Sequence, residues 1–523
     1  MKLDKEKDEG NVEYKLKLSP PSEERIEELA TQLNYRINEG GGEAFYELGV
    51  SDDGQLVGLT EQEAEEAFKV LSKICKKIGA SYMVLRKERA RRGYVFEVLV
   101  RRSVDVPPIT INVVLLGNVD AGKSTLKGVL ISGQLDDGDG AAMSWVAKYP
   151  HELKMRRSSS VSIHILGFDE RGRCINESLR YNEPEIYLRS SKIINLVDLA
   201  GHYRYLRTTL RGVLGSLPDY ALLVVGGNAG PIGSFKEHLG IAIVLGIPIA
   251  VAVTKIDMTP KEVLKRTLKD LVRIMKLPGI NRIPIVVKDR GDAVLAARYV
   301  KHGRLTPIFL VSNVTGQGLD LLKFFMNVLP PRIPWQERMK ESFLCYIDQK
   351  FDVSGVGLVV SGLVEYGSAS EGDKVLIGPM DDGSFRSVRI RSIQVNRMPV
   401  SRVVAGEMAG FALKGIEESR VRRGMVLLGP GADVRAVWKF KARIRVLHHP
   451  TTIRVGYEPV VHIHTIRQTC KIVRSSKPFL RTGDVAEVVF RFLKRPEYIK
   501  EGDVFIFREG TTRGLGKVLE TSL

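Results

Sequence analysis

The sequence has few cysteines and no long apolar run. Its four cysteines, Cys75, Cys174, Cys345 and Cys470, lie far apart and form no C-x-x-C pair. That spacing argues against a disulfide framework and against a cysteine zinc site. No apolar stretch reaches the length of a membrane span, and the opening MKLDKEKDEGNVEYK has no segment that resembles a signal peptide. We therefore expect a cytoplasmic protein with reduced thiols and no membrane contact.

Acidic residues are fewer than basic residues, and the excess of basic residues is concentrated towards the C-terminus. The net charge of the 523 residues is +18, and residues 435–523 contain 18 Lys or Arg against 8 Asp or Glu. Such an excess favours a polyanionic partner, because each phosphate that is neutralised releases condensed counterions. A solvated basic surface is the alternative interpretation. If a polyanion binds, its affinity should fall as salt rises.

Changes of pattern divide the chain into four predicted domains. Residues 1–105 are typical of an α+β domain, and residues 106–334 alternate apolar strands with helical patterns, as a doubly wound, mostly parallel α/β sheet requires. Beyond the PPRIP linker the helical periodicity ends. Short β-type runs with glycine turns then predict two β-barrels, one over 335–433 and a basic one over 434–523.

Several individual elements are also predicted. In the first domain we expect a helix from Ser22, a hairpin around Asp53-Gly54, and a second helix that opens with the capping box Thr60-x-x-Glu63. In the second domain five apolar runs are predicted as buried strands: 113–116, 193–197, 221–225, 249–253 and 308–311. Functional groups in such sheets gather at the carboxyl ends of the strands.

The segment GNVDAGKS follows the apolar run ITINVVLL and precedes a helical pattern, so it satisfies G-x-x-x-x-G-K-[ST] between a strand and a helix. In that context the loop's N–H groups surround phosphate oxygens, Lys123 supplies charge to the outer phosphates, and the Ser124 hydroxyl ligates Mg²⁺. The sequence thus predicts a nucleoside triphosphate site formed by Asn118, Val119, Asp120, Ala121, Gly122, Lys123, Ser124 and Thr125.

A second motif, DLAG, follows the strand pattern KIINLV. Its carboxylate, Asp198, is suited to hold Mg²⁺ through water, and the N–H of Gly201 is suited to meet the γ-phosphate. This arrangement predicts a hydrolytic switch.

Two further motifs indicate which base is bound. In TKID the Asp257 carboxylate can accept both N1–H and N2–H₂ of guanine, while the Lys255 stem lies along the base beside Thr254. Adenine lacks those donors, so the sequence predicts GTP. The third motif, formed by Ser312, Asn313 and Val314, would supply a backbone N–H near guanine O6.

Together, GNVDAGKS, DLAGH and TKID followed by two barrels resemble the translational GTPases typified by elongation factor Tu and elongation factor 1-alpha. Within that family the chain is similar to the GTP-binding protein 1 and 2 branch, which has DLAGH, TKID, an R-x-S-S-V switch segment and an EGxGEAFYELG-like stretch. Residues 157–161 and 40–49 match the last two. The segments 456–465 and 508–518 extend the similarity over essentially the whole chain.

The resemblance implies roles for particular residues. His202 matches the histidine that orients the attacking water, and Ser160, with Ser159 as the competing choice, matches the switch ligand of Mg²⁺. Asp120 matches a carboxylate that holds a monovalent cation near the phosphates. Thr254 replaces the family's Asn, so we expect base affinity to rest more on Asp257.

No arginine in the sequence stands out as a cis finger, so we expect a monomeric GTPase with slow intrinsic hydrolysis that a partner accelerates. The resemblance implies that this partner is the ribosome. The leading hypothesis for function is a GTP-dependent switch that binds tRNA or another RNA. The second is an RNA-binding factor of mRNA decay or surveillance. The third is a metabolic GTPase subunit like that of sulfate adenylyltransferase, which predicts neither RNA affinity nor an N-terminal α+β domain.

Overall fold

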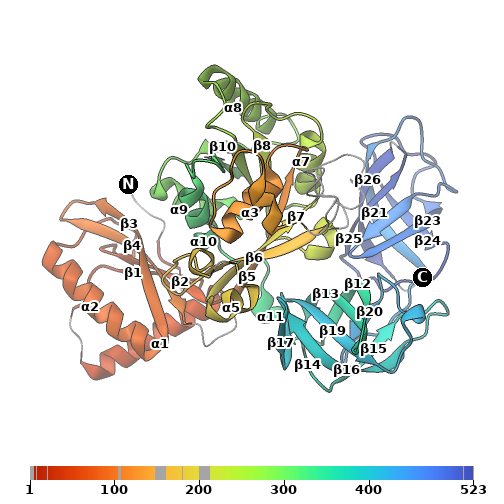
Figure 1. The fold of residues 1–523 in the computed structure, drawn as a ribbon, viewed down its shortest axis with the longest axis horizontal. Helices are drawn as coiled ribbons and strands as arrows, with labels where there is room; N and C mark the ends of the chain where they lie inside the picture. Colours follow the sequence, from red (N-terminus) through yellow and green to blue (C-terminus); the bar gives the residue numbers. More distant parts are fainter. Residues whose placement is uncertain are drawn as a thin grey trace. The chain divides into compact units, whose positions relative to one another are not determined.

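The structure is a computed structural model that describes residues 5–7, 9–19, 22–103, 108–147, 161–179, 181–199, 212–510 and 512–521. The chain forms two compact units (Figure 1). The first comprises Met1–Leu206 with Pro218–Ile333, and the second comprises Arg207–Leu217 with Pro334–Leu523. Within the described residues, no helix combines the length and the apolar character that crossing a membrane requires.

The first unit begins with a four-stranded sheet of order β1-β2-β4-β3 that packs against two helices. Its elements are β1 (Val12–Lys15), α1 (Glu23–Glu39), β2 (Glu43–Leu48), α2 (Glu61–Lys77), β3 (Ala80–Arg89) and β4 (Tyr94–Arg102). Both predicted helix starts are confirmed. Ser22 caps α1, and the Thr60 and Glu63 side chains form the reciprocal capping box of α2.

The predicted hairpin around Asp53-Gly54 is wrong in extent. Only an isolated bridge joins Val50 to Leu56. The reason is that β2 already uses both of its edges, pairing with β1 on one side and with β4 on the other. The segment after β2 therefore has no strand edge left on which to fold back.

The second part of this unit is a seven-stranded sheet of order β10-β11-β9-β8-β5-β7-β6. Its strands are β5 (Ile109–Gly117), β6 (Ser162–Phe168), β7 (Lys192–Asp198), β8 (Tyr220–Gly226), β9 (Ile249–Thr254), β10 (Ile283–Val286) and β11 (Leu305–Leu310). All pairs are parallel except β6 with β7. The predicted doubly wound, mostly parallel sheet is confirmed, and the two edge strands β6 and β10 are additions to the five expected strands.

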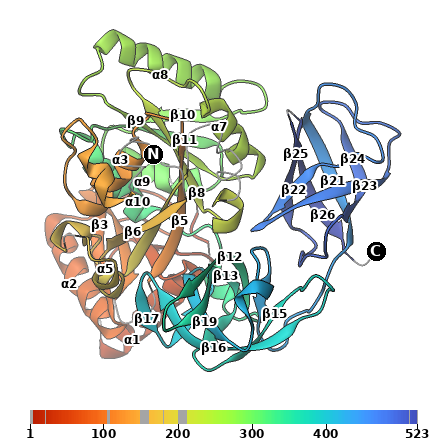
Figure 2. The same cartoon turned by 45° about the vertical axis from the view of Figure 1, so that its right-hand side comes forward.

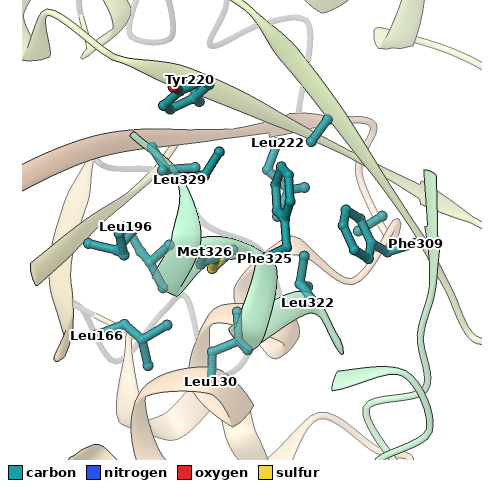
Figure 3. Packing of buried hydrophobic residues seen from close by; sticks show 14 of the residues in the cluster. Leu130, Leu166, Leu196, Tyr220, Leu222, Phe309, Leu322, Phe325, Met326 and Leu329 are labelled. Carbon is teal, nitrogen blue, oxygen red and sulfur yellow. The ribbon is translucent and has the colours of Figure 1, made fainter. Parts of the chain in front are cut away.

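Helices cover this sheet, and the apolar core lies between them and the strands. They are α3 (Lys123–Ser132), α5 (Glu183–Arg189), α7 (Phe235–Val244), α8 (Lys261–Met275), α9 (Arg290–Val300) and α10 (Leu319–Val328), with short 3-10 turns at Ala141–Trp145 and Asn176–Ser178. In Figure 3, Phe325 of α10 packs among Leu222 and Phe309 of the strands, and Leu130 of α3 lies below Leu196. This core fixes the positions of the carboxyl ends of β5, β7, β9 and β11 relative to one another.

A buried ion network joins the two sheets of the first unit. Glu43, at the start of β2, accepts hydrogen bonds from Arg101 at 3.0 Å and from Lys192 at 2.9 Å, and all three side chains are fully buried. Lys192 also donates to the carbonyl of Leu329, and Arg101 donates to the Asn327 side chain at 2.9 Å. Burial, opposed by Glu43, lowers the pKa of Lys192 to about 8.

In the second unit, residues 334–523 form the short helix α11 (Trp335–Arg338) and two β-barrels, which confirms the predicted fold class. In the first barrel, strands run in the order β15-β20-β12-β13-β19-β16, and a β15–β16 pairing closes the ring. The strands of this region are β12 (Leu344–Val353), β13 (Gly357–Tyr366), β14 (Ser368–Ser370), β15 (Lys374–Gly378), β16 (Arg386–Val395), β17 (Met398–Val400), β18 (Arg402–Val404), β19 (Met408–Lys414) and β20 (Val426–Leu428).

The second barrel is closed in the order β21-β24-β23-β22-β25-β26 (Figure 2). Its strands are β21 (Lys439–His448), β22 (Val460–Ile463), β23 (Ile466–Ser475), β24 (Val485–Phe492), β25 (Val504–Glu509) and β26 (Thr512–Glu520). Aromatic rings fill its interior, with Phe440, Phe490 and Phe505 in mutual contact. Along each strand the residues between these core positions face outwards.

Candidate nucleotide-binding site

The loop between β5 and α3 has backbone requirements that only glycine meets. Gly117 has φ 140°, and a Cβ atom there would lie 2.2 Å from the carbonyl oxygen of Val224 on β8. Gly122, at the N-terminus of α3, has φ 81° in the left-handed region. The chain can therefore turn sharply from strand into helix, and the N–H groups of the first helical turn face the loop.

Lys123 lies beneath this loop. Its side chain is 6% exposed, and its ammonium donates to the carbonyls of Gly117 at 3.1 Å and Asn118 at 2.8 Å. Burial lowers the pKa of Lys123, while the charges of Asp198 and Asp120 oppose that shift. The loop thus surrounds a desolvated cation, which interacts more strongly with anions than a hydrated one.

Ser124 and Asp198 meet although 74 positions separate them. The Ser124 hydroxyl donates to Asp198 Oδ2 at 2.6 Å, and both residues are buried. The contact arises because β5 and β7 are parallel neighbours whose register places Leu115 opposite Asp198. A hydroxyl and a carboxylate oxygen at this spacing are ligands that suit Mg²⁺.

The residues predicted to recognise the base also converge. Ser312, which follows β11, donates through its hydroxyl to Asp257 Oδ1 at 2.6 Å. The same hydroxyl accepts the N–H groups of Val314 and Thr315. The Ser312 N–H donates to Gln317, so Asn313 is the member of the predicted trio whose N–H has no hydrogen-bond partner among the described residues.

Thr254 is directed to the phosphate loop. Its buried hydroxyl donates to the Ala121 carbonyl at 2.8 Å and lies 3.3 Å from the Val225 carbonyl. The Asn313 amide is buried on the same side, since a Cβ atom on Gly122 would lie 3.6 Å from its Nδ2 and 3.5 Å from Thr254 Oγ1. Sequence reasoning assigned Asn313 only a backbone role, but its side chain brings an amide to the loop where Thr254 has none.

Two predicted site residues adopt a left-handed backbone. Asp120 has φ 61° and Lys255 has φ 59°. Non-glycine residues in this region carry strain that the surrounding structure must offset, and such residues cluster at functional sites. Their positions, in the phosphate loop and just after β9, agree with that tendency.

His238 was not predicted from the sequence. It lies on α7, is 1% exposed, and its Nδ1 accepts the N–H of Gly117 at 2.9 Å. Burial, aided by the charge of Lys123, lowers the pKa of His238 to about 4, which keeps the ring neutral. Nearby, the backbone N–H and hydroxyl of Ser234 both lie within hydrogen-bonding distance of Asn118 Oδ1. No local pattern around these two residues indicated contact with a loop more than a hundred positions away.

Val119 and Thr125 are partly exposed, the first in the turn of the loop and the second in the first turn of α3. Gly201, His202, Ser159 and Ser160 lie outside the described residues.

Comparison with known proteins agrees with this geometry. The Elongation factor Tu GTP binding domain matches residues 109–331, Elongation factor Tu domain 2 matches 357–428, and the Elongation factor Tu C-terminal domain matches 433–522.

Two relatives extend the similarity to the N-terminal domain. GTP-binding protein 1 of Xenopus laevis is 44% identical over 97% of this chain and 78% of its own length. GTP-binding protein 2 of Homo sapiens is 42% identical over 99% of this chain and 88% of its own length.

Among solved structures, translation elongation factor SelB from Methanococcus maripaludis in complex with the GTP analogue GPPNHP has a TM-score of 0.57 at 20% identity, covering 80% of each chain. At that identity the likeness shows the fold alone. The near full-length relatives and the three domain matches show more: the chain belongs to the elongation factor Tu-type translational GTPases, in the GTP-binding protein 1 and 2 branch, and hydrolyses GTP.

Proposed function

We propose that this GTPase is a switch that binds tRNA or another RNA in its GTP form and acts with the ribosome. The observation that carries the proposal is the convergence of four separate motifs on one guanine-nucleotide site, in a chain whose last barrel is strongly basic. A switch needs a γ-phosphate sensor and an effector surface. Asp198 and the segment after it would supply the first, and the basic barrel would supply the second.

The proposed site holds Mg²⁺ through the Ser124 hydroxyl, through Asp198 by way of water, and through Ser160 of the switch segment. A monovalent cation beside Asp120 is a further proposal. The buried Ser124–Asp198 pair supports the metal assignment, because both side chains offer oxygen atoms as metal ligands. Both also lie beside the Lys123 cation that would hold the outer phosphates. Mg²⁺ would neutralise charge that develops on the phosphates during hydrolysis.

In this proposal His202 orients the water that attacks the γ-phosphate, with Gly201 meeting the γ-phosphate itself. The protein's part in such a reaction is mainly positioning, and the missing activation comes from a partner. The ribosome is the proposed activator, so basal hydrolysis should be slow and strongly stimulated by ribosomes.

Crosslinking of RNA to the GTP-bound protein in cells, followed by sequencing, tests the cargo. Enrichment of tRNA acceptor ends supports the translation role. Enrichment of mRNA ends instead supports the second hypothesis, a GTPase of mRNA decay or surveillance. Absence of RNA would favour a metabolic subunit, although the folded N-terminal α+β domain counts against that third hypothesis.

A further inference from the structure

The outer face of β21 is lined by cations at every second position. Lys439, Lys441, Arg443 and Arg445 alternate with the buried residues Phe440, Ala442, Ile444 and Val446. Strand geometry therefore directs all four cationic side chains to the same side of the barrel. Neighbouring outward positions along a strand are about 7 Å apart, so the charges form a closely spaced line.

A second line of cations runs across the strands. Lys471 on β23 is directly opposite Arg491 on β24, and Arg491 is directly opposite Lys439 on β21. We call these three residues the basic row. Like charges directly opposite each other in a sheet are destabilising, so this row costs the barrel stability that mixed or neutral residues would not.

Nearby carboxylates offset only part of this charge. Glu487 on β24 pairs with both Lys441 and Arg443, at 2.8 and 2.9 Å, and Glu458 pairs with Lys471 at 3.0 Å. Within the described residues, Lys439 and Arg491 have no carboxylate within ion-pair distance. The centre of the face is therefore a repulsive arrangement of exposed cations.

An exposed tryptophan is next to the row in the chain. Trp438 directly precedes Lys439, and its side chain is 41% exposed. Its carbonyl accepts the N–H of Phe492, the residue after Arg491, at 2.9 Å, which places the backbone of Trp438 at the Lys439 end of the row. Burying this ring against a flat partner would remove apolar area from water.

We infer that the outer face of β23, β24 and β21 binds a single-stranded segment of RNA, with the basic row on its phosphates and Trp438 stacked on a base. The four strands β23, β24, β21 and β26 lie side by side in Figures 1 and 2, and form one continuous surface. The inference rests on the proposed RNA-binding function and assigns its contact surface.

The combination of a cationic track with an exposed aromatic ring favours single-stranded RNA over other acidic partners. An acidic protein would use the cations but would not need a stacking platform, whereas a base offers a π-face to the ring. A duplex keeps its bases stacked inside, so it would contact the row but leave Trp438 in water.

The first experiment compares the affinity of the full chain for a ten-nucleotide oligouridine with that of K439Q/K471Q/R491Q. The control, K69Q/K73Q/K76Q, removes the same net charge from exposed positions of α2. If each cation contacts one phosphate, the row variant should lower the slope of log affinity against log salt by about 2, and should bind about a hundredfold more weakly at 0.1 M salt. The control should bind like the unmodified chain.

Two further readouts distinguish a functional row from a structural one. Basal GTP hydrolysis should not change in the row variant, and its thermal unfolding temperature should be equal or higher, because the cross-strand repulsion is relieved. Oligouridine should also quench tryptophan fluorescence in the unmodified chain, and W438F should abolish that quenching, whereas an RNA duplex should cause little.

Three outcomes would overturn the inference. The first is oligouridine binding by the unmodified chain that the row variant retains. The second is equal weakening in the α2 control, and the third is a preference for the duplex with Trp438 unquenched. Failure of the proposed function is a different result, because the unmodified GTP-bound chain would then bind no RNA of any kind.

Discussion

The Ser312 hydroxyl donates a 2.6 Å hydrogen bond to Asp257 Oδ1 across a gap of 55 positions. The two residues follow β11 and β9, which pair in parallel, so both loops leave the sheet at the same edge. Two backbone N–H groups, from Val314 and Thr315, bind the same hydroxyl and hold it in place. Ser312 thereby orients the carboxylate that is predicted to recognise guanine.

Replacing Ser312 by Ala should therefore weaken GDP binding about tenfold, since a hydrogen bond to a charged group contributes about 1.5–3 kcal/mol. Isothermal titration calorimetry would measure the change. Thr315→Ala, which leaves the Ser312 hydroxyl and the backbone N–H groups intact, should bind like the unmodified chain. Equal affinities for Ser312→Ala and the unmodified chain would show that the contact does not orient Asp257.

Asp257→Asn should exchange base specificity. The substitution removes one acceptor for the guanine donors and places an amide N–H where xanthine has a carbonyl at C2. Loss of one charge-assisted hydrogen bond, together with loss of the negative charge that strengthens the other, should weaken GTP binding by at least about a hundredfold, while XTP binding should improve. Competition between the two nucleotides, followed by their displacement of a fluorescent GDP, measures both. A variant that loses GTP and XTP alike would count against Asp257 as the base reader.

His238 should make the first unit sensitive to acid. Its folded pKa is about 4, below the ordinary value of 6.5, so the unfolded chain binds more protons between these two pH values. Stability contributed by the neutral ring is therefore fully present above about pH 6.5 and is lost as the pH falls towards 4, by up to about 3 kcal/mol. Urea unfolding between pH 4 and pH 7 measures the loss.

The matched variant is His238→Asn, which keeps an acceptor for the Gly117 N–H but does not titrate in this range. Acid lability from carboxylates is shared by both proteins, so the difference between their stability profiles isolates the histidine. Parallel profiles would contradict the prediction.

Glu43→Gln should destabilise the first unit by about 3–5 kcal/mol, because it leaves the buried cations of Arg101 and Lys192 without a counter-charge. Chemical denaturation followed by circular dichroism measures the effect. The control is Glu28→Gln, whose partner Arg25 is exposed and whose ion pair should contribute less than about 1 kcal/mol. Similar losses of stability for both variants would show that the buried Glu43 network contributes no more to stability than an exposed ion pair.

His202→Ala should abolish ribosome-stimulated hydrolysis and leave GTP affinity nearly intact, because the histidine is proposed to orient water and not to hold the nucleotide. Single-turnover hydrolysis with and without ribosomes, beside a GTP-binding titration, separates the two effects. If ribosome-stimulated turnover is unchanged in His202→Ala, His202 does not orient the attacking water.

Local chemistry explains which predictions succeeded. The capping box at Thr60 and Glu63 lies within one helical turn, and the phosphate loop consists of eight consecutive residues. Both can therefore be predicted from the local sequence without knowledge of distant contacts. The hairpin around Asp53-Gly54 looked equally local, yet it is limited to one antiparallel bridge, because β1 and β4 occupy both edges of β2. Strand pairing is decided by competition across the whole sheet.

By itself, the sequence determined the class of fold, the GTP specificity predicted from Asp257 and the positive charge of the last barrel. These depend on periodicity, on short motifs and on composition. Only the tertiary structure decided that Asn313 brings its amide to the phosphate loop and that His238 accepts a hydrogen bond from the Gly117 N–H, 121 positions away. It also decided that three cations from three strands form one row. Such contacts depend on which strands become neighbours and in what register, and packing of the entire core sets both.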